Sequence, residues 1–182
     1  VFQDPMVGTA ANMEIEENLA MAYRRGKNRT LAWGIKNKER TLYKEKLALL
    51  DLGLEDRMKS KVGLLSGGQR QALTLLMSTL QKPDLLLLDE HTAALDPKTA
   101  AKVLELTEQF VKKDNLTAFM VTHNMRHAIQ YGNRLIMMMK GQIIYDVRGE
   151  EKKNLKVEEL LEKFGAAGEL NDDDRNKIWN SV

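Results

Sequence analysis

Two short segments of the sequence combine the residue types that hold phosphate groups and metal ions. The segment Leu64-Leu65-Ser66-Gly67-Gly68-Gln69 places a hydroxyl and two glycines just before a stretch with helical spacing. Backbone N–H groups at a helix start attract anions, and glycine lets a phosphate approach the backbone closely. The second segment is the leucine run 85–88, which ends at two carboxylates, Asp89 and Glu90. A carboxylate at the carboxyl end of a strand can hold Mg²⁺, and another can orient an attacking water, so the pair indicates chemistry on a nucleoside triphosphate.

Each segment also has a purely structural interpretation. Ser66 ahead of two glycines could be only a helix N-cap, and Asp89 and Glu90 could only cap a helix that follows a strand. Asp96 before Pro97 is likewise an ordinary helix start. The complete string from Leu64 to Gln71 and its spacing, with Ser66 23 positions before Asp89, favour the chemical interpretation.

The elements that must position these residues follow from hydrophobic spacing and from turn residues. We expect strands at 85–88, 117–122, 134–139 and 142–146, the last two joined by a tight turn at Lys140-Gly141. We expect helices at 13–25, 38–52, 69–80, 97–113, 125–131 and 155–164. This alternation predicts an α/β fold with a mostly parallel sheet. The apolar runs 85–88 and 118–121 predict strands buried on both faces, residues 26–37 predict a loop, and the tail from Glu169 predicts a frayed end.

Composition narrows the classes of function. The net charge is +2 and only 5% of residues are aromatic, so neither a basic surface nor a base-stacking platform for nucleic acid is indicated. There are no cysteines, which fits a reducing compartment and excludes a thiolate metal site. No apolar run approaches the roughly 20 residues of a membrane span, so we expect any membrane role to come through a partner.

The order of the motifs resembles the ATP-binding subunit of ABC transporters. In that family the LSGGQ string is the signature motif, which touches the γ-phosphate of an ATP held mainly by the other subunit of a head-to-tail dimer. The resemblance implies this contact for Ser66, Gly67, Gly68 and Gln69. The leucine run resembles the Walker B strand, which implies that Asp89 holds Mg²⁺ and that Glu90 orients or deprotonates the attacking water.

Three further positions match motifs of the same family. Gln3 in Val1-Phe2-Gln3-Asp4-Pro5 resembles the Q-loop glutamine, which reaches Mg²⁺ or the attacking water. Asp96 resembles the D-loop aspartate at the dimer interface, and His123 resembles the switch histidine that contacts the γ-phosphate and the attacking water.

Two other histidines receive no catalytic role. His91 stands where many relatives have proline or alanine, and the departure leaves Asp89 and Glu90 unchanged. His127 lies four residues after His123, but a metal site is disfavoured because no third ligand is evident.

The phosphate-cradling Walker A loop is missing from the sequence. No Gly-x-x-x-x-Gly-Lys-Ser/Thr occurs in the 182 residues, although that loop and its lysine grip the β- and γ-phosphates in this reaction class. We therefore expect the carboxyl-terminal portion of a P-loop NTPase-like ABC ATPase, without its amino-terminal β portion and unable to hydrolyse ATP alone. Residues 1–165 would form a partial ATPase domain, with a helical subdomain at about 5–80, a RecA-like core portion at 81–150 and a polar tail at 166–182.

The resemblance implies an ATP-hydrolysing subunit that energises a bacterial importer of an amino acid or a similar small solute. Its cofactors would be ATP and Mg²⁺. Its partners would be a second ATPase subunit, a transmembrane permease and, indirectly, an extracellular solute-binding protein. It would lie in the cytoplasm on the inner face of the plasma membrane. Two alternatives stay open: a non-catalytic interaction module, which the missing loop favours, and a soluble ABC ATPase outside transport, which usually carries a second cassette or a long coiled-coil insertion.

Overall fold

The computed structural model describes residues 1–27 and 34–167, which form two compact units. The first unit is Val1–Val121 and the second is Thr122–Val182. Part of the predicted loop at 26–37, and the predicted tail from Glu169, lie outside the described residues.

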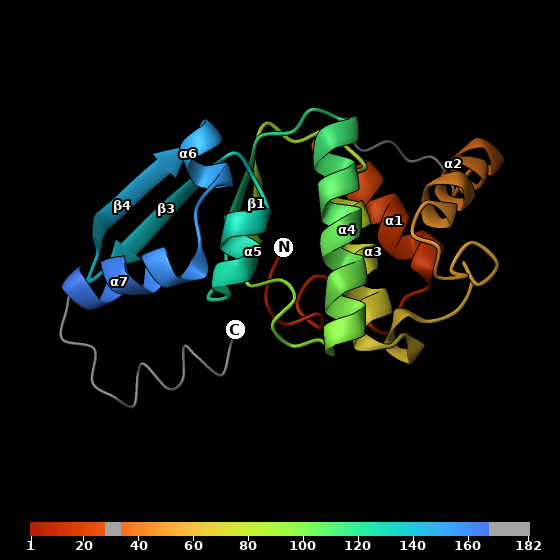
Figure 1. The fold of residues 1–182 in the computed structure, drawn as a ribbon. Helices are drawn as coiled ribbons and strands as arrows, with labels where there is room; N and C mark the ends of the chain where they lie inside the picture. The colour runs from red at the N-terminus through yellow and green to blue at the C-terminus, as the bar shows by residue number, and fades with distance from the viewer. Residues whose placement is uncertain (28–33, 168–182) are drawn as a thin grey trace. The chain divides into compact units, whose positions relative to one another are not determined.

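The first unit is built around helix α3 (Gly67–Thr79). Every residue of this helix from Arg70 to Met77 is buried, which is typical of a helix surrounded by other elements. Helices α1 (Ile15–Tyr23), α2 (Asn37–Ala48) and α4 (Pro97–Lys113) all contact it, and α4 runs beside it (Figure 1). A short 3-10 turn at Val62–Leu64 leads into α3.

The same unit contains two parallel strands, β1 (Leu86–Asp89) and β2 (Ala118–Val121), paired from Leu86 opposite Ala118 to Asp89 opposite Val121. The prediction that both faces of these strands are buried is wrong. Leu86 and Leu88 are 3% and 2% exposed, whereas Leu87, Phe119 and Val121 are 56%, 48% and 44% exposed. Alternate side chains of a strand point to opposite faces, so one face packs on the helices and the other is uncovered.

The second unit consists of helix α5 (Met125–Gln130), the antiparallel strands β3 (Arg134–Met139) and β4 (Gln142–Arg148), and helices α6 (Gly149–Lys153) and α7 (Val157–Ala167). The predicted tight turn between the strands is confirmed, because Lys140 and Gly141 both have positive φ, 48° and 78°. Side chains of α5, the hairpin, the α6–α7 connection and α7 form a separate small core: Met125, Leu135, Met137, Val147, Leu155 and Leu160.

The predicted helices and strands are confirmed to within a few residues, with two differences. Helix α2 ends at Ala48 rather than at residue 52, because the chain turns there and Asp51 takes a positive φ of 55°. Helix α6 was not predicted, since five residues are too few to show a period. Among the described residues, no helix has the length and apolar composition needed to cross a membrane.

Asn18 of α1 fixes the path of the chain before that helix. Its side chain is fully buried, and its Oδ1 accepts from the N–H of Ala10 at 2.8 Å. Its Nδ2 donates to the carbonyls of Ala10, at 3.1 Å, and of Glu14, at 2.9 Å. The Ala10 N–H has this side chain as its partner, whereas the carbonyls of Ala10 and Glu14 also accept from the N–H groups of Met13 and Asn18.

We expect Asn18→Ala to lower the free energy of unfolding by about 2 kcal/mol, because the half-buried N–H of Ala10 loses its partner and the carbonyls of Ala10 and Glu14 each lose one of two hydrogen bonds. Urea denaturation followed by circular dichroism measures the change. Asn37→Ala, at an exposed position in the first turn of α2, is the control and should change stability by less than about 0.5 kcal/mol. Equal effects of the two substitutions would contradict the role assigned to Asn18.

Candidate functional site

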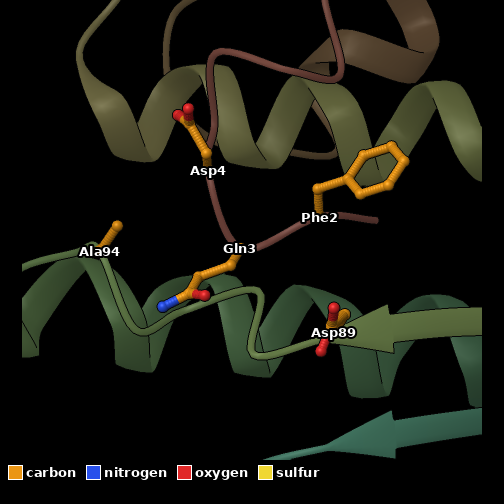
Figure 2. Close-up of a pocket in the computed structure, with 5 residues that line it drawn as sticks. All are labelled: Phe2, Gln3, Asp4, Asp89 and Ala94. Atoms are coloured by element: carbon orange, nitrogen blue, oxygen red, sulfur yellow. The ribbon is translucent and has the colours of Figure 1, made fainter.

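Gln3 and Asp89 line one open pocket in the first unit. The pocket has a volume of about 390 Å³ and is lined by Phe2, Gln3, Asp4, Asp89 and Ala94. Figure 2 shows the Gln3 side chain extending toward the segment that carries Asp89 and Ala94, while Asp4 points the other way. Two residues predicted separately, 86 positions apart in the sequence, are therefore brought together.

Backbone pairing explains why they meet. The amino group of Val1 donates to the carbonyl of Leu87 at 2.6 Å, and the N–H of Asp89 donates to the carbonyl of Val1 at 3.0 Å. These bonds lie on the edge of β1 opposite β2, and they run in the pattern of a parallel bridge. Gln3, two residues further on, consequently lies at the carboxyl end of β1.

Two polar residues of α3 that the sequence did not predict as functional hold the segment that carries Gln3. Gln71 Nε2 donates to the carbonyl of Phe2 at 2.9 Å. Arg70 is buried, and its guanidinium donates to the carbonyl of Val62 at 3.1 Å and contacts the sulfur of Met6. Polar side chains among the apolar residues of a core helix were the available signal, because such groups need buried partners.

Glu90 takes a backbone conformation that is rare for its residue type. Its φ is 41°, in the left-handed region, and its N–H donates to the carbonyl of Val121 at 3.0 Å while its carbonyl accepts from Ala93 at 2.9 Å. Strained conformations of this kind persist only where the surroundings enforce them, and they gather at functional sites. The Asp89 side chain is exposed and that of Glu90 half-buried, so the two carboxylates have different surroundings.

His91 anchors the segment after Glu90 to α4. Its ring is buried, and Nε2 lies 3.1 Å from the hydroxyl oxygen of Thr107. The Thr107 hydroxyl donates to the carbonyl of Val103 at 2.8 Å, so its oxygen accepts from the Nε2–H of His91. The imidazole is a buried structural group at this position.

Ser66 and Gln69 form a capping box at the start of α3. Ser66 Oγ accepts from the N–H of Gln69 at 3.3 Å, and Gln69 Oε1 accepts from the N–H of Ser66 at 3.2 Å. Ser66 is therefore the N-cap of α3, as its structural interpretation predicts. It is compatible with an anion site at the same helix start, because capping of this type uses only some of the first-turn amides. Residues 66–69 do not belong to the lining of the pocket beside Asp89.

Asp96 caps α4 in the same manner. Its Oδ1 accepts from the N–H of Thr99 at 3.1 Å. The hydroxyl and the N–H of Thr99 both hydrogen-bond the carboxylate and lower the pKa of Asp96. The side chain is exposed, so the capping role leaves it accessible.

His123 belongs to the second unit, where it lies exposed two residues before the start of α5. Its role in catalysis stays a prediction. His127, in α5, packs edge-on against Tyr131 with ring centroids 6.0 Å apart, and burial together with the nearby His123 lowers its pKa. Across residues 1–27 and 34–167, no three His, Cys, Asp or Glu side chains gather as a metal-ligand group.

The residues of the pocket nevertheless fit a magnesium ion of the kind that accompanies nucleotides. Mg²⁺ takes oxygen ligands, keeps several waters and is typically held by one or two carboxylates plus substrate phosphates. Asp89 supplies a carboxylate and Gln3 an amide oxygen in the same open pocket.

Comparison with solved structures identifies the fold. A metal-chelate type ABC transporter in an inward-facing conformation matches 90% of this chain and 63% of its own, with a TM-score of 0.70 and 25% identity. A dimeric ATP-binding cassette with ADP and Pi bound, in a post-hydrolysis state, matches 81% of this chain and 61% of its own, with a TM-score of 0.62 and 27% identity. The class of protein that the fold defines is the P-loop NTPase-type ABC ATPase, as the sequence predicts.

Comparison of sequences gives the family. The family model described as "ABC transporter" matches residues 1–93. The tyrosine transport ATP-binding protein of Clostridioides difficile is 52% identical over 164 residues, 90% of this chain and 65% of that protein. The methionine import ATP-binding protein MetN 2 of Oenococcus oeni is 38% identical over 108 residues, 59% of this chain and 30% of that protein. The chain belongs to the ABC transporter family, and it spans less than two thirds of the length of these relatives.

We expect Glu90→Gly to be more stable than Glu90→Ala by about 1 kcal/mol, because glycine adopts a positive φ without the cost that a Cβ imposes. The comparison uses urea unfolding of the two variants, both of which lack the carboxylate. At exposed Glu108, inside α4, the same pair should show the opposite order, since glycine costs about 1 kcal/mol relative to alanine in a helix. Greater stability of alanine at position 90 would show that the strain is absent.

Proposed function

We propose that the chain is part of an ATP-binding and ATP-hydrolysing subunit that energises a bacterial importer of an amino acid or a similar small solute. The observation that carries the proposal is the 52% identity, over 90% of this chain, to a tyrosine transport ATP-binding protein. The pocket that joins Gln3 and Asp89 at the end of β1 supports it. We further propose residues 1–165 as a partial ATPase domain, with a helical subdomain at about 5–80 and a core portion at 81–150.

Each of the four residues Gln3, Asp89, Glu90 and His123 has a separate role in this proposal. Asp89 and Gln3 would hold the ion and its waters beside the γ-phosphate. Bound Mg²⁺ would neutralise charge that develops on the phosphates during transfer. Glu90 would orient the attacking water and accept its proton, and His123 would contact the γ-phosphate and the same water.

We propose a second copy of the subunit as the first partner. The signature residues Ser66, Gly67, Gly68 and Gln69 and the pocket beside Asp89 are different parts of the first unit, since none of the four lines that pocket. A head-to-tail dimer would let residues 66–69 and Asp96 of one copy serve the ATP held mainly by the other. A permease on the inner face of the membrane, and a solute-binding protein outside, would complete the importer.

A non-catalytic interaction module is the second candidate for the 182-residue polypeptide taken alone. The observation that favours it is the absence from the sequence of a Gly-x-x-x-x-Gly-Lys-Ser/Thr loop, which supplies much of the hold on the β- and γ-phosphates. Ser66, Gly67 and Gly68 would still be able to complete an ATP site on another subunit.

The two candidates differ in ATP turnover. We expect the purified 182-residue chain to release no phosphate from ATP above the buffer rate. In the complete subunit that we propose, Glu90→Gln should lower kcat by about 100-fold or more, the contribution of a positioned general base, with ATP binding retained. Phosphate release and binding of a fluorescent ATP analogue measure the two properties. Glu108→Gln on the exposed side of α4 is the control and should leave both unchanged.

If the 182 residues alone hydrolyse ATP, and Glu90→Gln abolishes that hydrolysis, the proposed need for a Walker A loop is overturned. Unchanged kcat in Glu90→Gln of the complete subunit would overturn the role of Glu90.

The proposed transport role predicts a specific loss of uptake. Cells that carry Glu90→Gln in the chromosomal gene should lose most high-affinity uptake of one amino acid, with tyrosine the first to test because of the relative named above. Uptake of radiolabelled tyrosine, methionine and a phosphonate, compared with cells carrying Glu108→Gln, measures this. Normal uptake of all solutes, together with copurification of the subunit with ribosomes or DNA, would favour a soluble ABC ATPase instead.

A further inference from the structure

The two glycines at the start of α3 have different surroundings. A Cβ built on Gly67 would lie 3.6 Å from its nearest neighbour, Leu95 Cδ2, which is an ordinary van der Waals distance. A Cβ built on Gly68 would lie 1.9 Å from Thr99 Cγ2 and 3.3 Å from Thr99 Cβ. Gly68 is buried, so this contact holds the first turn of α3 directly against the first turn of α4.

Thr99 cannot turn its methyl away without a consequence at Asp96. Its N–H donates to Asp96 Oδ1 at 3.1 Å, and its hydroxyl also hydrogen-bonds the Asp96 carboxylate. The methyl and the hydroxyl share one Cβ, and χ1 of threonine is restricted to a few staggered positions. One rotamer therefore presents the methyl to Gly68 and the hydroxyl to Asp96 at the same time.

We propose that Thr99 is a positioning residue that couples Gly68 of the signature segment to Asp96 within one chain. Gly68 must lack a side chain because Thr99 occupies that space, in addition to any approach of a phosphate to its backbone. A displacement of the α3 start toward α4 would turn the Thr99 side chain and break the bond from its hydroxyl to the Asp96 carboxylate. The coupling is a property of this chain's packing. That the coupling acts in an ATP site is a more detailed form of the proposed function and rests on it.

The pKa of Asp96 reports the coupling, since both bonds from Thr99 stabilise the ionised carboxylate. A pH titration of the side-chain carboxyl carbon by NMR, on the 182-residue chain without nucleotide, measures it. We expect Gly68→Ala to raise the pKa of Asp96 toward the ordinary aspartate value of about 3.9. The matched control Gly67→Ala should leave the pKa lowered, because its Cβ has room.

Variants of Thr99 separate the methyl from the hydroxyl. Thr99→Ser keeps the hydroxyl bond and removes the methyl, so it should leave the pKa of Asp96 lowered and should reverse the effect of Gly68→Ala in the double variant. Thr99→Val removes the hydroxyl and should raise the pKa of Asp96 with Gly68 intact.

The proposal would be overturned if the pKa of Asp96 were as high in the double variant Gly68→Ala/Thr99→Ser as in Gly68→Ala alone. It would also be overturned if Gly68→Ala left the pKa of Asp96 unchanged. If Gly68→Ala fails to fold, the double variant decides: a folded chain with a lowered Asp96 pKa supports the coupling, and an unfolded one contradicts it. The titration uses no ATP, so an unchanged pKa of Asp96 would not contradict the role proposed for Glu90. Conversely, a negative result in the phosphate-release experiments on Glu90 would not contradict the coupling between Gly68 and Asp96.

Discussion

Strand β1 is hydrogen-bonded along both of its edges, and the position of the pocket lined by Gln3 and Asp89 depends on that pairing. One edge pairs with β2, and the other pairs with Val1 through the carbonyl of Leu87 and the N–H of Asp89. The first pairing ends with the bond from the Glu90 N–H to Val121, and the second brings Gln3 beside Asp89. Carboxyl ends of parallel strands are where α/β sheets place their ligands. The pairing of this short strand thereby brings the amide group of Gln3 close to the carboxylate of Asp89, although the two residues are far apart in the sequence.

Helix α3 serves both the core and the candidate site. Its apolar residues pack in the core of the first unit, while Arg70 and Gln71 contact the segment that carries Gln3, at Met6 and Phe2, and its first turn packs on the first turn of α4. Because the helix is close-packed along its length, a movement at its start also displaces the residues packed against it. The structural and the chemical interpretations of the motif at residues 66–69 are therefore complementary. The capping box orders the helix start, and the ordered helix start is what could present backbone N–H groups to a phosphate.

What the sequence predicts correctly is encoded locally. Asp96-Pro97 begins α4 where expected, since the cap and the fixed φ of proline act within one turn, and Lys140-Gly141 turns the hairpin because two adjacent residues accept positive φ. The exposure of Leu87 and Phe119 could not be predicted, because it depends on what packs on that face of the strands. In the site, Gln3 and Asp89 were identified from motifs, and their proximity follows from long-range pairing. The φ of Glu90 and the contact of Gly68 with Thr99 leave no local pattern, since they arise from tertiary packing. A polar Gln71 in an apolar helix indicates that it needs a buried partner, but it does not indicate that the partner is Phe2.

Helix α5, directly after the segment with His123, has only six residues, too few for a helix to be stable in isolation. It is held at both ends: Asn124 Oδ1 accepts from the N–H of His127 at 3.0 Å, and the Lys152 ammonium donates to the carbonyls of Ile129 and Tyr131. Lys152 lies on α6, 29 positions after His123 in the sequence. Its burial lowers its pKa, so the charge that holds the helix end is itself kept at a cost in solvation. We therefore expect the two short helices to open together in amide hydrogen exchange, so that protection of the backbone beside His123 depends on a lysine far along the chain.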